Sequence, residues 1–182
     1  MTAAPPDGLA LRESGQDDGP ALAEIYGHHV LTGLASFEEM APDAAEMARR
    51  RAALVDAGWP HLVAERGGRV VGFAYGSPWR PRPAYRWTIE DSVYVAPDAL
   101  GGGIGRALLS ALIDRATAGG WRQMMAVIGD SGNAASIALH ARLGFRPVGT
   151  LEAVGFKHGR WVDVVLMQRA LGPGSAALPE SG

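Results

Sequence analysis

The chain has 182 residues, of which 47% are hydrophobic and 20% are charged, and its formal net charge is −2. This length suits one domain with one hydrophobic core, and the small net charge gives no overall attraction to nucleic acid or to an anionic membrane. The absence of cysteine excludes disulfides, thiolate metal sites and cysteine nucleophiles.

The two ends of the chain lack apolar periodicity. Residues 1–8 and 172–182 are rich in Pro, Gly, Ala and Ser, so we expect both to be flexible around a single domain at 9–171. The N-terminus has no basic segment followed by an apolar core, and no run approaches the roughly 18 apolar residues of a membrane span. We therefore expect a cytoplasmic protein without membrane contact.

The first half of the predicted domain begins with a short strand at 9–13. Asp18 before Pro20 marks the start of a helix, and a second helix is expected at 42–56. Residues 61–76 contain two β-rich runs joined by Gly67-Gly68, which suits a tight hairpin turn because both residues can adopt positive φ.

The second half alternates more regularly between strand and helix patterns. The expected elements are a strand at 86–95, a helix at 104–118, a strand at 123–128, a helix at 133–143 and two final strands at 145–156 and 159–170. The helix at 104–118 is well defined, because its apolar residues recur at the spacing of one buried stripe. Mixed strands and helices in this order predict an α/β (α+β) sheet with helices on both faces.

A glycine-rich turn, LGGGIG, precedes that helix. A turn of this kind leaves backbone N–H groups unpaired at the positive end of the helix dipole, which suits a phosphate. A dinucleotide fingerprint fails because Arg106 stands where its third glycine belongs, and a P-loop would need Lys followed by Ser or Thr. A turn without a ligand is the alternative.

Longer segments carry a family resemblance. VYVAPDALGGGIGRALL and NAASIALHARLGF resemble the two signature segments of the GNAT superfamily of acetyl-CoA-dependent N-acetyltransferases. AYRWTIEDSVYV, AVIGDSGNAASIALH and AVGFKHGRWVDV resemble its phosphinothricin and methionine sulfoximine N-acetyltransferase branch. The resemblance covers residues 9–171 and implies the GNAT fold, whose mixed sheet would splay between strands 86–95 and 123–128. It also implies acetyl-CoA as co-substrate and a homodimer.

The same resemblance implies an acetyl-CoA site. Main-chain groups of Val93, Tyr94 and Val95 would pair with the pantetheine arm. The pyrophosphate would lie on Gly101, Gly102, Gly103, Ile104 and Gly105, with charge from Arg106, and Asn133 would reach the arm as well as cap its helix. Leu100 departs from the family pattern, in which Arg or Gln is usual. Because the resemblance implies that the phosphate contacts come mainly from backbone N–H groups, the site is expected to survive this change, and its effect on acetyl-CoA affinity stays open.

Glu90 is the expected general base for the acceptor amine. Its neighbours Trp87 and Ile89 are apolar, and such surroundings raise a carboxyl pKa toward neutrality. Asp91 should point to the opposite face of the strand. The alternative for Glu90 is a surface residue paired with an arginine.

His140 is the expected acid, because the resemblance places it where many GNAT enzymes carry a tyrosine that protonates the departing thiolate. A partly buried structural histidine is the alternative. The other histidines, at positions 28, 29, 61 and 158, show no metal-ligand spacing, so no metal is expected.

The stretch WRPRPAYRW at 79–87 is the expected acceptor loop. Arg80 and Arg82 would grip the anion of an amino-acid-like substrate, with Tyr85 and Phe37 as pocket walls. A solvated loop, and core packing for Phe37, are the alternatives. The predicted function is N-acetylation of a small amino-acid analogue. Acetylation of a polyamine or a protein N-terminus, and a non-catalytic acyl-CoA-binding regulator, are the rivals.

Overall fold

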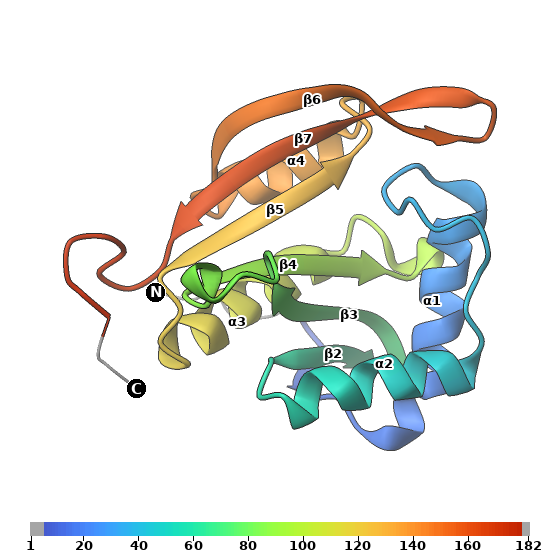
Figure 1. Cartoon of the computed structure of the whole chain (residues 1–182). Coiled ribbons are helices and arrows are strands. Elements are labelled where there is room, and N and C mark those ends of the chain that lie inside the picture. Colours follow the sequence, from blue (N-terminus) through green and yellow to red (C-terminus); the bar gives the residue numbers. More distant parts are fainter. Residues whose placement is uncertain (1–5, 180–182) are drawn as a thin grey trace.

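A mixed sheet of seven strands runs through the computed structural model, which describes residues 6–179 (Figure 1). Its strands are β1 (Leu9–Glu13), β2 (His61–Arg66), β3 (Arg69–Pro78), β4 (Thr88–Val95), β5 (Gln123–Gly129), β6 (Arg146–Lys157) and β7 (Arg160–Ala170). They are ordered β1-β2-β3-β4-β5-β7-β6, and β4 with β5 is the parallel pair. The predicted fold class and strand order along the chain are confirmed.

Helices cover both faces of this sheet. They are α1 (Gly19–Thr32), α2 (Ala44–Asp56), α3 (Ile104–Ala118) and α4 (Ala134–Arg142). Helices α1 and α2 pack on one face of β2, β3 and β4, whereas α3 packs against those strands and β1, and α4 packs against β5 and β6. The expected apolar stripe of α3 is buried, with Ile104, Leu108 and Leu112 at most 1% exposed. Asn133 caps α4 as expected, because its side chain accepts a hydrogen bond from Ser136 N–H.

The sheet separates between its two middle strands. β4 and β5 pair from Thr88 with Gln123 to Asp91 with Ala126, and among residues 6–179 the rest of β4 pairs with no strand on that side. Figure 1 shows the two strands diverging from there. The expected splay is therefore present, and it opens a gap beside residues 92–95.

The main chain of β4 alternates between its two neighbours along this gap. Ala96 N–H donates to Val71 O on the β3 side at 2.9 Å, and Tyr94 is paired in register with Phe73. In an antiparallel pair, residues that face the partner alternate with residues that face away. The N–H and C=O groups of Val93 and Val95 therefore face the gap, and those of Tyr94 face β3.

The start of β4 and the two chain ends can be compared with the sequence-based expectations. β4 begins at Thr88, two residues later than expected, because Pro83–Tyr85 forms a 3-10 turn. Of the predicted flexible ends, residues 1–5 and 180–182 lie outside the described part of the chain, and their flexibility remains a prediction. Within the described residues, no helix is both long enough and apolar enough to cross a membrane.

Candidate active site

A cavity of about 930 Å³ lies at the gap between β4 and β5. Its walls come from the end of β4, the glycine turn, the face of α4 and the loop after α1. Ten of the residues expected in the site line it: Val93, Tyr94, Val95, Gly101, Gly103, Ile104, Gly105, Arg106, Asn133 and His140. The size suits an extended cofactor, since ligand cavities commonly measure about 300–1,000 Å³.

The glycine turn leads directly into α3 from the cavity wall. Gly101 and Gly103 have φ of +78° and +73°, which side chains other than glycine rarely adopt. Gly103 is the N-cap, and its carbonyl accepts from Ala107 N–H. The N–H groups of the first turn of α3 consequently have no partner within the helix, which is the arrangement that binds phosphate.

Two arginines line the cavity, and a third lies at the turn. Arg106 is exposed and lines the cavity, and Arg142, which the sequence did not single out, lines it from the end of α4. The guanidinium of Arg66, from β2, would lie 3.6 Å from a Cβ at Gly102. Gly102 is not part of the cavity wall, and Leu100 is 64% exposed on it. Arg66 thus brings to the turn a positive charge that Leu100 itself does not carry.

At the open edge of β4, the prediction that the main chain of Tyr94 would pair with the pantetheine arm differs from the structure. Val93 and Val95 turn N–H and C=O groups into the gap, whereas the main chain of Tyr94 faces β3. The ring of Tyr94 lies on the α1 side, 4.9 Å from Tyr26 and 5.2 Å from Phe73 between ring centroids. Pairing with an arm in the gap is therefore open to Val93 and Val95, and Tyr94 contributes packing.

Glu90 points to the same face of β4 as Ser92 and Tyr94, two residues that line the cavity. Burial, and secondly the charge of Asp91, raise the pKa of the Glu90 carboxyl to about 7, and the nearby Arg80 guanidinium opposes this shift. The carboxyl is half-buried and is not among the groups that line the cavity. A carboxylate with a pKa near neutrality can accept a proton from an amine at neutral pH.

Asp91 points the opposite way, as expected, and meets His140. Its Oδ2 lies 3.0 Å from Nε2 of His140, and both side chains are nearly inaccessible. Nδ1 of the same imidazole lies 2.8 Å from the carbonyl oxygen of Ser136. Burial opposes the charged imidazole, but the hydrogen bond and charge of Asp91 outweigh burial and raise the pKa of His140. Both ring nitrogens therefore have acceptor partners inside the protein.

The residues expected to hold the acceptor lie outside the cavity wall, on the Glu90 side of the sheet or in exposed loops. Arg80, Arg82 and Tyr85 are exposed, and the Arg80 guanidinium lies over the ring of Trp79 at 5.0 Å. Phe37 is 42% exposed and lies against Gly155, where a Cβ would overlap its ring. The structure brings Arg80 near Glu90 and leaves Phe37 on a separate loop.

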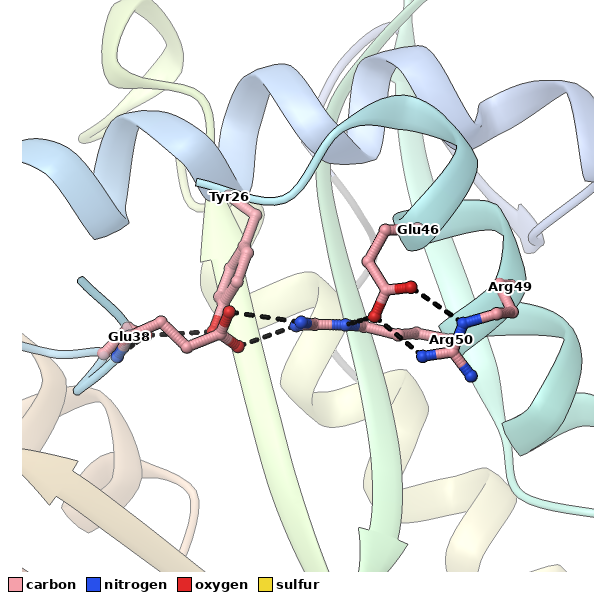
Figure 2. A network of polar contacts seen from close by, with 6 residues as sticks. Tyr26, Glu38, Glu46, Arg49 and Arg50 are labelled. Carbon is pink, nitrogen blue, oxygen red and sulfur yellow. Dashed lines mark hydrogen bonds and ion pairs between the residues drawn. The ribbon is translucent and has the colours of Figure 1, made fainter. Parts of the chain in front are cut away.

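The loop that carries Phe37 is tied to the rest of the domain by side chains that the sequence did not reveal. Glu38 accepts hydrogen bonds from Tyr26 and Arg50, at 2.9 and 2.7 Å (Figure 2). Lys157, which is 3% exposed, donates to the Ser36 carbonyl from β6 at 2.6 Å. These contacts hold the loop between α1, α2 and the β6–β7 hairpin.

The chain is similar to known proteins in sequence and in fold. Residues 28–145, more than half of the chain, match the model of the Acetyltransferase (GNAT) family. The chain belongs to the GNAT acetyltransferase family. As in that family, its co-substrate is acetyl-CoA. Separately, among the described residues no group of three or more His, Cys, Asp or Glu could hold a metal ion.

Individual GNAT proteins match over most of their length. A phosphinothricin N-acetyltransferase of Alcaligenes faecalis is 59% identical over 90% of this chain and 83% of its own. An L-methionine sulfoximine/L-methionine sulfone acetyltransferase of Pseudomonas paraeruginosa is 43% identical over 92% of this chain and 98% of its own. A phosphinothricin acetyltransferase from Sinorhizobium meliloti, solved in complex with AcCoA, superimposes with a TM-score of 0.93 at 48% identity, over 96% of this chain and 95% of its own.

Proposed function

We propose that this acetyltransferase moves the acetyl group of acetyl-CoA to the amino group of a small amino-acid analogue of the phosphinothricin, methionine sulfone or methionine sulfoximine type. The observation that carries the proposal is the position of Glu90, a carboxyl with a pKa of about 7 that lies on the same face of β4 as the cavity-lining residue Ser92, two positions away. The names of the two similar enzymes above support the choice of acceptor.

In this proposal each part of acetyl-CoA has its own set of contacts. The phosphates lie on the unpaired N–H groups of α3. Arg106 and Arg142, from the cavity wall, and Arg66, at the glycine turn, add positive charge. The pantetheine arm pairs with Val93 and Val95 as an added strand. The thioester then lies in the gap, where an amine can approach it from the Glu90 side.

Acetyl transfer forms a C–N bond and breaks the C–S bond. Glu90 takes a proton from the acceptor ammonium, directly or through water, so that the neutral amine can attack the thioester carbonyl. The nitrogen loses a second proton to solvent as the amide forms, and the leaving thiolate takes up a proton. His140 is the proposed donor for that step, although Asp91 and the Ser136 carbonyl each engage one of its ring nitrogens. Delivery from His140 therefore requires one of these hydrogen bonds to break.

The acceptor loop favours an anionic substrate. Arg80, Arg82 and Arg86 are its charged residues, and it holds no acid. Guanidinium groups match the planar carboxylate or phosphinate of an amino-acid analogue. A polyamine would be repelled by such a loop, which is why we rank polyamine acetylation lower.

A substrate screen tests the proposal. Purified protein with acetyl-CoA is offered phosphinothricin, methionine sulfone, methionine sulfoximine, spermidine and a short peptide, and thiol release is measured. Release with one of the three amino-acid analogues, well above the rate without amine, is expected. Release with spermidine or the peptide alone would replace the proposed acceptor, and acetyl-CoA binding without turnover on any amine would favour a regulator.

We also propose that two copies associate through β6 and the start of β7. β6 is an edge strand, and Val148, Leu151, Val154, Phe156 and Trp161 form an exposed apolar group on this hairpin. Exposed apolar patches of this kind mark protein interfaces. Light scattering on the wild type should give the mass of a dimer, and Trp161→Glu should shift it to a monomer; a monomeric wild type would refute the assembly.

A cytoplasmic location remains a prediction from the sequence.

A further inference from the structure

The open edge of β4 presents both donors and acceptors to the gap. Val93 and Val95 each direct one N–H and one C=O toward it, because their neighbours in the strand pair with β3. A thioester oxygen gains negative charge during acyl transfer, so N–H groups stabilise the transition state there and unpaired carbonyl oxygens oppose it. A carbonyl at this edge that the pantetheine arm leaves unpaired is therefore a liability for the reaction.

One of these two carbonyls is already occupied by a side chain. Nε2 of His29, which comes from α1, lies 2.9 Å from the oxygen of Val95. A carbonyl oxygen can only accept, so Nε2 must carry the hydrogen. Both residues line the cavity. The peptide between Val95 and Ala96 is thus held at both ends, since Ala96 N–H donates to Val71 O.

The His29 ring is fixed in place and carries little charge at neutral pH. Its centroid lies 5.6 Å from that of Tyr94, and the side chain is half-buried between α1 and β4. Burial lowers the pKa of His29, and the neighbouring His28 lowers it further. The hydrogen bond to Val95 opposes both effects. The ring therefore masks a carbonyl dipole without placing a positive charge at the open edge of β4.

We propose that His29 is a positioning residue for acyl transfer, which holds the Val95 carbonyl so that the edge of β4 offers the thioester N–H donors and one fewer unpaired acceptor. The proposal rests on the acetyl transfer and on the place of the thioester proposed above. His29 acts through the main chain of Val95 and exchanges no proton with the substrate.

Three variants of adjacent histidines test this role. His29→Leu removes the donor, and His29→Gln retains an N–H at a similar distance from the main chain. His28→Leu is the matched control, because His28 is the exposed neighbour on the same helix and does not line the cavity. The measurements are kcat with the best acceptor from the screen, the Kd of acetyl-CoA and the thermal midpoint.

A tenfold or larger fall in kcat is expected for His29→Leu, since direct loss of one oxyanion donor costs roughly a hundred- to a thousandfold and His29 acts on that site indirectly. The Kd of acetyl-CoA should stay within about threefold of wild type, and His29→Gln should recover most of kcat, because the effect belongs to the transition state. Wild-type kcat in His29→Leu would overturn the proposal. Equal losses of kcat in His29→Leu and His29→Gln, accompanied by equal falls in the thermal midpoint, would also overturn it.

A spectroscopic measurement on the wild type keeps the test decisive if the variants fail to fold. Nitrogen-15 NMR of labelled histidines, with acetyl-CoA bound, should show His29 as a neutral ring protonated at Nε2. A ring protonated at Nδ1 alone would overturn the proposal. This NMR measurement needs no acceptor amine. It therefore distinguishes a failure of the His29 proposal from a failure of the proposed function, because the substrate screen tests the latter.

Discussion

Nε2 of His140 lies 3.0 Å from Oδ2 of Asp91, and the two side chains are 5% and 2% exposed. The pair joins α4 to β4 across the base of the cavity. Oδ1 of Asp91 has no hydrogen-bond partner among the described residues, so the imidazole is its main compensation. Removing either member would leave a buried polar group without its partner.

We expect His140→Leu to lower the free energy of unfolding by about 3–5 kcal/mol, the usual cost of breaking a buried pair. Asp91→Leu combined with His140→Leu should cost less than the two single changes together, because no uncompensated charge is left. Urea denaturation followed by circular dichroism measures both. Additive losses would mean that the two side chains do not act as a pair.

The same pair gives stability a pH dependence. The pKa of His140 is raised in the folded protein above 6.5, so its contribution is fully present below pH 6.5 and is lost as the pH rises through the folded pKa. The stability difference between wild type and His140→Gln should therefore shrink above pH 6.5. A difference that grows with pH would contradict the raised pKa.

Glu90→Gln should lower kcat by about a hundredfold or more, because a general base contributes about that much. The Kd of acetyl-CoA should hardly change, since the side chain lies outside the cavity wall. In the wild type, kcat/KM should fall as the pH drops below about 7, where the carboxyl becomes protonated. Arg80→Gln should move that limb to higher pH, because Arg80 lowers the pKa of Glu90.

Gly103→Val should weaken acetyl-CoA binding, because a branched side chain at φ +73° strains the turn and crowds the phosphate site. Gly58→Val is the control: its φ is +83° and its surroundings are open, but it lies after α2 and does not line the cavity. Titration calorimetry should show a loss for Gly103→Val alone. Equal affinity in both folded variants would remove the turn from the phosphate site.

Arg66→Gln should raise the Kd of acetyl-CoA several-fold if its guanidinium supplies charge to the phosphates, since charge-assisted contacts are about twice as strong as neutral ones. The effect should shrink with added salt, which screens exposed charges. Arg49→Gln, an exposed arginine on α2 paired with Glu46, is the matched control and should bind normally. A Kd for Arg66→Gln equal to that of the control would exclude the arginine from the site.

Arg80→Gln or Arg82→Gln should raise the KM for an anionic amino-acid analogue by roughly tenfold, as expected for a charge-assisted contact. Acetyl-CoA should bind as before. An amine of similar size without the anion should be affected less, because no partner is then lost. If the loop is only solvated surface, both variants will match wild type within about twofold on every amine.

The order of helices and strands was readable from the chain because it depends on local periodicity. The stripe of α3, the Asn133 cap and the Gly67-Gly68 hairpin each follow from spacing within one element, and the structure has them where they were expected. The glycine turn and the acid pair Glu90 and Asp91 were readable for the same reason. Strand alternation alone sends those two carboxylates to opposite faces.

Which partner each side chain meets was decided by the tertiary structure. His140 is 49 positions from Asp91 and His29 is 66 from Val95, and no local pattern encodes such distances. The divergence of β4 from β5 after Asp91 leaves the Val93 and Val95 main chain open, and it depends on how two layers of helices pack on one sheet. The sequence by itself determined the elements and the chemistry they carry; packing determined which groups are buried, paired or left free to react.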